Sequence, residues 1–383
     1  MKSTTQPNTH SSRATLIPAR ASRKVLANPI TPPLACAVFL WAVLGLGITQ
    51  PALAQGYLQT NLVSDVPGKA ALTDTNLMGA WGVVHSATSP WWVNSTAGHV
   101  SLIFNGAGQP IPLVVPVPPT GVSAPTGIAF NGGTNFLVAP GKPARFIFAT
   151  LNGVISGWNS PTVEAIAVDN SASAAYTGLT IARQNGQDTL YAANFNQGTI
   201  DVFNSNFAPV TLPQGAFVDS QIPSTFTVFN VLLVNGQIYV TYAPKNVFGN
   251  SDAPGQGFVD AFDTSGNLLL RLRGGFWMNA PWGVALAPAG FGQFSNHLLV
   301  GMFGNGQIAA FDTKHGNFHG LLRGPDDQPV TIGTGLWGLG FGNGANAGPT
   351  NSLYFAADFV QNGFHGIFGA ITAAPETEDD SGD

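Results

Sequence analysis

The sequence predicts an all-β protein, a six-bladed β-propeller closed by a strand from near the N-terminus. Three observations predict it: the composition, a pattern that recurs six times, and a strand-like segment before the first copy. Only 9% of the residues are charged, whereas 47 are Gly and 28 are Pro. A helical protein of this size would carry more Lys, Glu and Arg at exposed positions, but short strands joined by many turns suit this composition.

Each repeat opens with a Gly and alternating apolar residues, continues with a second apolar run, and ends in a turn and a third run that closes with Phe-Asp or Phe-Asn. The third repeat is the clearest, over 178–181, 190–195 and 198–204, and the fifth follows it over 283–286, 298–303 and 306–312. The residue before each opening Gly, or its equivalent, lies at position 81, 126, 177, 230, 282 and 337. This spacing is typical of propeller blades.

Each repeat supplies three clear strands, and we expect a weaker fourth strand in the intervening segments, such as 111–115. Radial blades of this kind leave only short, protected edges. The last repeat ends after its third strand near Ile371, while the strand-like segment 57–63 precedes the first repeat. We therefore expect this N-terminal strand to complete the sixth blade.

The first 54 residues differ from the rest. Five basic residues precede an apolar run over 34–48, and Ala52-Leu53-Ala54 follows as a small-x-small cleavage site. This order indicates a secretory signal peptide, and the apolar run is shorter than the roughly 20 residues of a membrane span. The predicted organisation is a signal peptide over 1–54, a propeller over 55–372 and a disordered acidic tail over 373–383. The mature product is expected to be secreted or periplasmic, with no membrane span.

Cleavage after Ala54 would leave nine basic and 19 acidic residues, a net charge of −10. Nucleic-acid binding needs clustered Lys and Arg, so we expect no nucleic-acid partner. The only cysteine, Cys36, lies in the leader, which leaves the mature chain without disulfide or thiol chemistry. A monomer is expected.

Eight short segments spread over residues 56–372 carry a family resemblance: 61–65, 125–128, 155–159, 200–203, 257–260, 280–283, 335–337 and 365–369. In these segments the chain resembles a family of exported bacterial β-propeller proteins of uncharacterised function. That family is similar in architecture to NHL-repeat and SMP-30-type six-bladed propellers. The resemblance implies the fold and export but no chemistry.

The innermost strands of a propeller surround a central channel, so their first residues are expected at its mouth. Aromatic and amide side chains there would make an apolar pocket with a few polar groups, as small-ligand sites usually have. The predicted ligand-binding residues are Trp81, Tyr176, Phe229, Asn230, Asn279, Trp282 and Trp337. The alternative is that the Trp side chains pack between the blades as core, with the Gly after each allowing close approach.

A metal site is a second candidate. Asp74 and Asn76 are expected near the channel mouth and offer the oxygen ligands that Ca²⁺ prefers, but a turn or capping role explains them as well. SMP-30-type lactonases hold their metal with a Glu, Asn residues and an Asp. The only Glu of the propeller is Glu164, between the second and third repeats, so that set is not reproduced. No cofactor is evident. Four further acids at strand ends are interpreted as turn residues: Asp201, Asp260, Asp263 and Asp312.

The sequence shows no zinc-binding His pair, nucleophilic Ser elbow or phosphate-binding Gly loop. Two functions stay open. The first is a module that binds a small molecule, a glycan or a protein at the channel mouth. The second is a metal-dependent lactonase or related hydrolase. The missing Glu and the few His residues favour binding, and whether the protein is an enzyme is left open.

Overall fold

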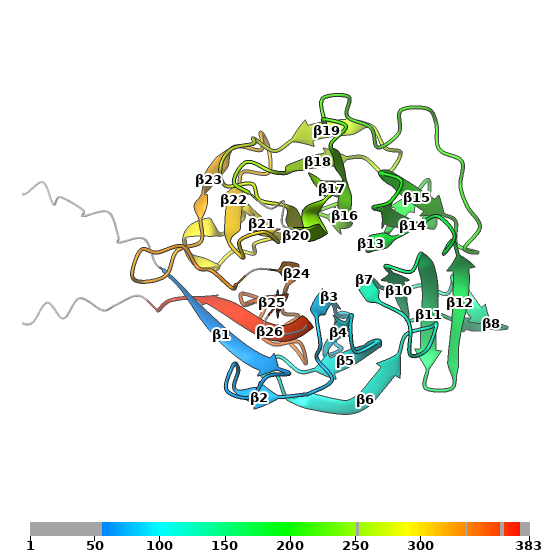
Figure 1. The fold of residues 1–383 in the computed structure, drawn as a ribbon, viewed down its shortest axis with the longest axis horizontal. Helices are drawn as coiled ribbons and strands as arrows, with labels where there is room; N and C mark the ends of the chain where they lie inside the picture. Colours follow the sequence, from blue (N-terminus) through cyan, green and yellow to red (C-terminus); the bar gives the residue numbers. More distant parts are fainter. Residues whose placement is uncertain (1–55, 250–252, 334, 361–363, 376–383) are drawn as a thin grey trace, which may run out of the picture. The chain divides into compact units, whose positions relative to one another are not determined.

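The computed structural model describes residues 56–249, 253–333, 335–360 and 364–375 (Figure 1). Six sheets lie around one central axis, which confirms the six-bladed propeller. Apart from two short 3-10 helices, η1 (Val247–Gly249) and η2 (Gly292–Phe294), the regular elements of the described residues are all strands. None of the helices in this part of the chain is long and apolar enough to cross a membrane. The predicted signal peptide and most of the predicted tail lie outside the described residues, so both stay predictions.

The first two blades each have four strands. Blade one consists of β3 (Ala80–Val84), β4 (Trp91–Ser95), β5 (Val100–Phe104) and β6 (Pro110–Pro116). Blade two consists of β7 (Pro125–Phe130), β10 (Phe146–Thr150), β11 (Val154–Ser160) and β12 (Val163–Asp169). A small pair, β8 (Leu137–Ala139) and β9 (Lys142–Pro143), forms a separate sheet that contacts β12. The strand β6 covers the segment 111–115, where a weaker fourth strand was expected.

Blade three has three strands, β13 (Tyr176–Gln184), β14 (Gln187–Asn194) and β15 (Thr199–Phe203), and differs from the expected four. Beyond β15 the pairing continues only as an isolated bridge between Phe203 and Pro209. The following segment also contains Pro213 and Pro223. Because Pro has no N–H to donate to a strand ladder, these positions are unfavourable for a fourth strand.

Blade four consists of β16 (Phe226–Val234), β17 (Gln237–Pro244), β18 (Phe258–Phe262) and β19 (Leu268–Arg271). Blade five consists of β20 (Pro281–Leu286), β21 (Leu298–Met302), β22 (Ile308–Phe311) and β23 (Phe318–Leu321). Their innermost strands, β16 and β20, run along the central axis with β3, β7 and β13 (Figure 1).

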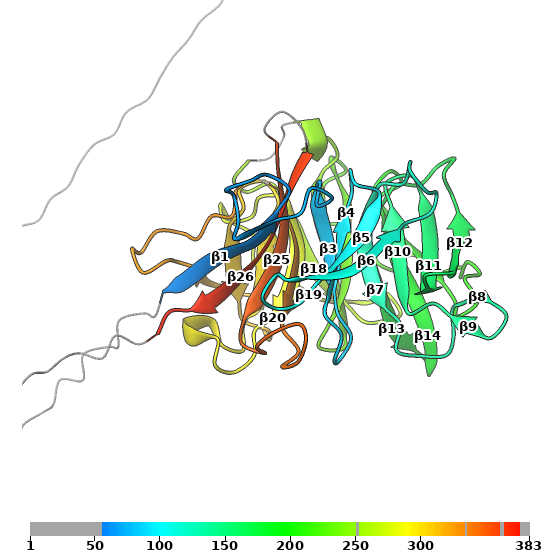
Figure 2. The same cartoon turned by 90° about the horizontal axis from the view of Figure 1, so that it is seen from below.

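The sixth blade is closed by the N-terminal strand, as expected. Its sheet order is β2 (Leu72–Thr73), β1 (Tyr57–Ser64), β26 (Phe364–Ala373), β25 (Leu353–Val360) and β24 (Leu336–Phe341). The pairing of β1 with β26 is antiparallel and places Tyr57 opposite Ala373, and the two strands lie side by side in both views (Figures 1 and 2). The buried Tyr57 hydroxyl donates to the Phe291 carbonyl at 2.9 Å and accepts from the Phe294 amide at 2.9 Å. These bonds attach the closing strand to blade five as well.

Glycines allow neighbouring innermost strands to approach closely. A Cβ atom at Gly82 would lie 2.3 Å from the Thr126 carbonyl oxygen, and one at Gly283 would lie 2.4 Å from the Trp337 carbonyl oxygen. A larger residue would force the blades apart at these points. The glycines therefore bring the preceding side chains, among them Trp81 and Trp282, close to the axis.

Candidate functional site: a pocket at the centre of the propeller

Three indole rings pack against one another at the central axis. The rings of Trp81 and Trp337 are stacked, with centroids 3.5 Å apart and an interplanar angle of 17°. The Trp282 ring stands edge-on to both, at 6.3 Å from Trp81 and 5.8 Å from Trp337. All three side chains are less than 5% exposed. They are core residues, as the alternative interpretation expected, but they pack at the axis and not between blades.

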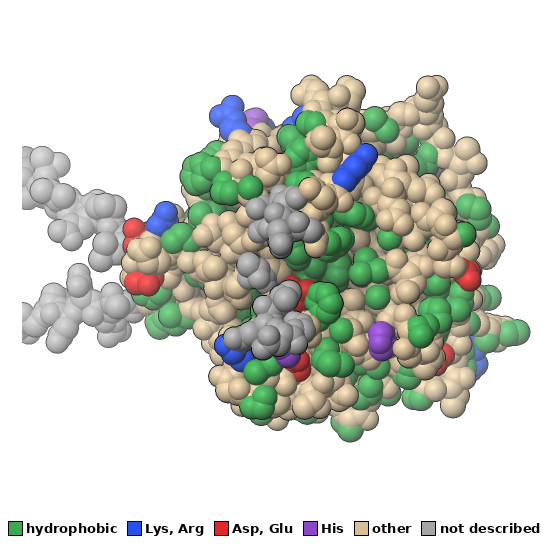
Figure 3. Space-filling view, in the orientation of Figure 1, with side chains coloured by type: hydrophobic (Ala, Val, Ile, Leu, Met, Phe, Trp, Pro, Cys, Tyr) green, Lys and Arg blue, Asp and Glu red, His purple; other side chains and the backbone are tan. Residues whose placement is uncertain are grey.

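A cavity of about 590 Å³ lies against this cluster. In the space-filling view, hydrophobic side chains gather in the hollow at the centre of the face, with acidic and histidine side chains beside them (Figure 3). The walls come from the turns before the innermost strands and from the connections that follow the second strands. The lining residues that carry the argument below are Trp81, His99, Phe248, Phe303, Trp337 and Asp358.

Phe248 forms a wall that sequence patterns did not indicate. It belongs to the short helix η1, and its side chain is 51% exposed. Its ring centroid lies 6.3 Å from that of Trp81, 6.2 Å from Phe303 and 6.4 Å from Trp337. An apolar ring that stays half exposed over buried aromatic residues is available to cover a ligand.

The structure places the predicted aromatic residues at different depths. Trp81 and Trp337 line the pocket. Trp282 and Phe229 belong to the same buried cluster but not to the pocket wall. The Trp282 indole N–H donates to the Thr177 carbonyl at 3.2 Å, a bond that ties blade five to blade three across the axis.

The remaining predicted ligand residues hold the scaffold together. Tyr176 packs between blades two and three, where its hydroxyl donates to Asp201 Oδ2 at 2.9 Å. Asn230 Nδ2 donates to the Trp282 carbonyl at 2.9 Å and so links two neighbouring innermost strands. Asn279 is buried, and its backbone carbonyl accepts from the backbone amide of Gly304, which lines the pocket.

Asp74 and Asn76 form a local turn outside the pocket lining. Asp74 Oδ1 accepts from the Asn76 backbone amide and from Asn76 Nδ2, both at 3.0 Å. This is the arrangement expected of a turn residue. Within the described ranges, no group of three or more His, Cys, Asp or Glu side chains is placed to hold a metal ion.

Asp358 is the residue of the pocket that sequence reasoning missed. It lies near the end of β25, and its backbone amide donates to the Gly335 carbonyl at 2.8 Å. A Cβ atom at Gly335 would lie 1.6 Å from Asp358 Oδ1, so only Gly leaves room for this carboxyl group. Burial raises the pKa of Asp358 to about 7, and the Trp337 side chain opposes part of that shift. A carboxyl group of this kind changes its charge near neutral pH.

A faint signal for Asp358 was present in the sequence. Asp358 holds the place in the sixth repeat that Phe195 holds in the third, since the Asp358 amide donates to the Gly335 carbonyl as the Phe195 amide does to the Ala175 carbonyl. Thr96, Leu151 and Phe303 occupy the same place in the first, second and fifth repeats, so an acidic residue there distinguishes the sixth repeat. His99, in the turn between β4 and β5, is the other titratable residue that lines the pocket in the described part of the chain, and its Nδ1 bonds the Ser123 carbonyl.

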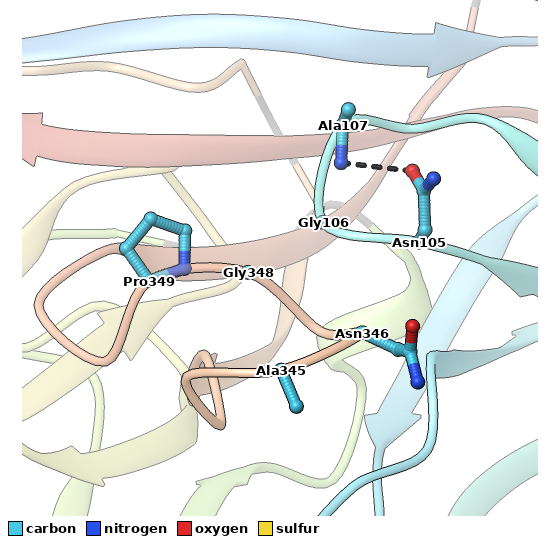
Figure 4. A pocket seen from close by; sticks show the side chains of 7 residues that line it. All are labelled: Asn105, Gly106, Ala107, Ala345, Asn346, Gly348 and Pro349. Atoms are coloured by element: carbon cyan, nitrogen blue, oxygen red, sulfur yellow. Dashed lines mark hydrogen bonds between the residues drawn. The ribbon is translucent and has the colours of Figure 1, made fainter.

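A second hollow, of about 340 Å³, lies between the β5–β6 turn and the β24–β25 connection (Figure 4). Its wall consists of Asn105, Gly106, Ala107, Ala345, Asn346, Gly348 and Pro349. Asn105 Oδ1 accepts from the Ala107 amide at 2.9 Å, which shapes the turn (Figure 4). These side chains carry no titratable group, so the hollow offers no candidate chemistry.

No family model matches the chain. It is similar to three uncharacterised proteins of Acanthamoeba polyphaga mimivirus. R648 is 28% identical over 328 residues (81% of this chain and 78% of R648), and L690 is 29% identical over 308 residues (73% and 77%). R640 is 30% identical over 214 residues, which cover 52% of this chain and 39% of R640. These relatives are viral, so the bacterial origin and the export implied by the family resemblance stay predictions.

Solved structures with a similar fold have very different sequences. Virginiamycin B lyase from Staphylococcus aureus is 10% identical with a TM-score of 0.48, covering 82% of this chain and 98% of the lyase. A gluconolactonase from Xanthomonas campestris is 14% identical with a TM-score of 0.42, and the match covers 84% of this chain and 99% of the gluconolactonase. Neither similarity bears on the activity of this chain.

Proposed function

We propose that this chain is an exported binding protein that holds a small, largely apolar molecule in the central pocket. The pocket itself is the observation that carries the proposal. Its volume of about 590 Å³ falls in the range of roughly 300–1,000 Å³ for small-molecule sites. Its wall is mainly apolar, with several aromatic side chains and two titratable groups, as such sites usually are. Export rests on the predicted leader, and a mature N-terminus at Gln55, read by N-terminal sequencing, would support it.

The concave shape favours a small molecule over a protein partner, because a protein interface needs a larger and flatter surface. The metal-dependent hydrolase has no specific observation in its favour, since the described residues present no group of three or more His, Cys, Asp or Glu side chains placed to hold a metal. Binding is therefore the function that the geometry supports best.

The variant Phe248→Ala tests the pocket with little risk to folding. The side chain is half exposed, so its removal should leave the melting temperature nearly unchanged, whereas it takes away one wall of the site. We expect fragments detected by saturation-transfer-difference NMR on the wild-type protein to lose most of their signal on this variant. A panel of neutral, cationic and anionic aromatic fragments would serve as probes.

Phe276→Ala is the matched control. Phe276 is also a largely exposed Phe, 69% accessible, but it does not line the pocket. Its removal should leave fragment binding as it is in the wild type. Fragment signals that are equal on all three proteins, or absent from all three, would contradict the proposed function.

A further inference from the structure

The described lining of the pocket includes a carboxyl group, that of Asp358, but no Lys or Arg side chain that could pair with it. Among the described residues that line it, Asp358 and His99 are titratable, and there is no Lys or Arg. No ion pair joins Asp358 to a basic side chain of the described chain. A carboxylate in such a site gives up solvation by water without gaining a protein cation in return.

The elements packed around Asp358 do not supply that cation. The strands β3 and β24 carry no titratable side chain. The strand β26 carries His365, whose Nδ1 lies 2.7 Å from Asp65 Oδ2. His99 is held at the pocket wall by the Ser123 carbonyl. A positive charge beside Asp358 would therefore have to come with the ligand.

The rings beside Asp358 suit such a charge. Trp81 and Trp337 are stacked on each other and less than 5% exposed, so they present little of their rings to the pocket. Phe248 and Phe303 stand within 6.4 Å of the Trp337 ring, and Phe248, which is 51% exposed, offers an accessible ring. The faces of Trp and Phe rings attract cations, and the attraction is stronger in sites shielded from water. Groups of aromatic rings with a carboxylate recognise ammonium ions in this way.

We propose that the ligand of the central pocket is an organic ammonium ion, with its charge beside Asp358 and its apolar body against Phe248 and Phe303. This inference rests on the proposed function and names the chemical class of the ligand. A neutral molecule of the same shape would gain the apolar contacts only. An anion would meet the Asp358 carboxylate and be repelled.

Three probes with the same aromatic body test the sign of the charge: benzylamine, benzyl alcohol and benzoate. At pH 8, isothermal titration calorimetry should show benzylamine binding roughly tenfold or more tightly than benzyl alcohol, and no binding of benzoate. In Asp358→Asn, which keeps the shape of the side chain, the affinity for benzylamine should fall to that for benzyl alcohol. The affinity for benzyl alcohol should stay as in the wild type, which shows that the variant is folded.

The affinity for benzylamine should also depend on pH. The cation gains its extra affinity from the ionised form of Asp358, whose pKa is about 7, whereas the protonated form should bind it no better than Asp358→Asn does. The affinity should therefore rise between about pH 5 and pH 8 by the same factor that separates benzylamine from benzyl alcohol, and level off on either side. In Asp358→Asn this dependence should disappear. If the variant keeps it, another group is responsible, and the inference is wrong.

The outcomes separate the two proposals. If benzyl alcohol binds as tightly as benzylamine, and Phe248→Ala weakens both, the pocket is a binding site but its ligand is not a cation. If benzoate binds best, the assigned charge is wrong. If none of the three probes binds in a way that Phe248→Ala weakens, the proposed function fails as well.

Discussion

Arg271 shows how much one side chain contributes inside blade four. Its Nε lies 2.9 Å from Oδ1 of the fully buried Asp260, and its Nη2 contacts Asp219. Burial raises the pKa of Asp260 to about 6, although Arg271 opposes the shift. Without the guanidinium group, Asp260 would remain buried with no cation.

Replacing Arg271 by Ala is expected to lower the free energy of unfolding by about 3–5 kcal/mol, because it leaves the buried carboxyl group of Asp260 without a cationic partner. Chemical denaturation monitored by circular dichroism would measure the loss. Arg183→Ala is the control: Arg183 is 74% exposed, its distance to Asp188 is 3.9 Å, and exposed pairs contribute about 1 kcal/mol or less. Equal losses for the two variants would rule out the stated role of Arg271.

The acidic residues at strand ends show what sequence patterns can resolve at this scale. Asp263 and Asp312 accept from backbone amides of their own turns, as their interpretation as turn residues requires. Asp201 and Asp260 do not fit that interpretation, because they accept from Tyr176 and Arg271 inside the blades. Asp201 and Asp260 lie inside the third strands of their blades, β15 and β18, whereas Asp263 and Asp312 directly follow β18 and β22. The shared description of all four as strand-end acids did not separate these two positions.

Among the elements, the closing strand β1 is the one on which the ring depends. It pairs along its length with β26, and Tyr57 is bonded to the η2 region of blade five. Deleting residues 56–64 should expose the edge of β26 and lower the melting temperature by on the order of 10 °C or more. Differential scanning calorimetry would measure this.

The matched variant for that deletion is Tyr57→Phe. It removes the two hydrogen bonds of the hydroxyl and keeps the strand, so the expected loss is about 1–3 kcal/mol. A deletion that melts no earlier than Tyr57→Phe would show that β1 does not close the blade.

The strands could be predicted because their apolar pattern recurs in every repeat. The residues of the pocket wall could not, because they differ from one repeat to the next. The alternating apolar residues of the innermost strands indicated six blades and placed Trp81 and Trp337 near the axis. Phe248 lies in a single helical turn, η1, that has no counterpart in the described connections between the second and third strands of the other blades. Asp358 gains its importance from burial and from Gly335, which comes close to it only in the folded blade.

For the whole molecule, the raised pKa values predict how stability changes with pH. Burial raises the pKa of Asp358 to about 7 and that of Asp260 to about 6, against about 3.9 for an unfolded Asp. Between those values the folded chain holds protons that the unfolded chain has released, so the free energy of unfolding falls as the pH rises. Asp312, with a pKa of about 2, acts in the opposite direction, but only below this window.

Calorimetry at constant ionic strength should therefore give a melting temperature that declines from about pH 5 to pH 8. Asp358→Asn should reduce the decline, chiefly between pH 5 and 7. A melting temperature that is constant or increases over this range would contradict the burial of the two carboxyl groups.

The pairing of β1 with β26 has a consequence for biosynthesis. All of the other five blades separate the two strands in the chain, and the backbone amide of Ala374 still reaches the Gly56 carbonyl at 2.7 Å. During translation, β1 cannot pair with β26 until the other five blades have been synthesised. A nascent chain stalled before β26 would keep an unpaired strand edge, which is where chaperones or misassembly with a second chain would act.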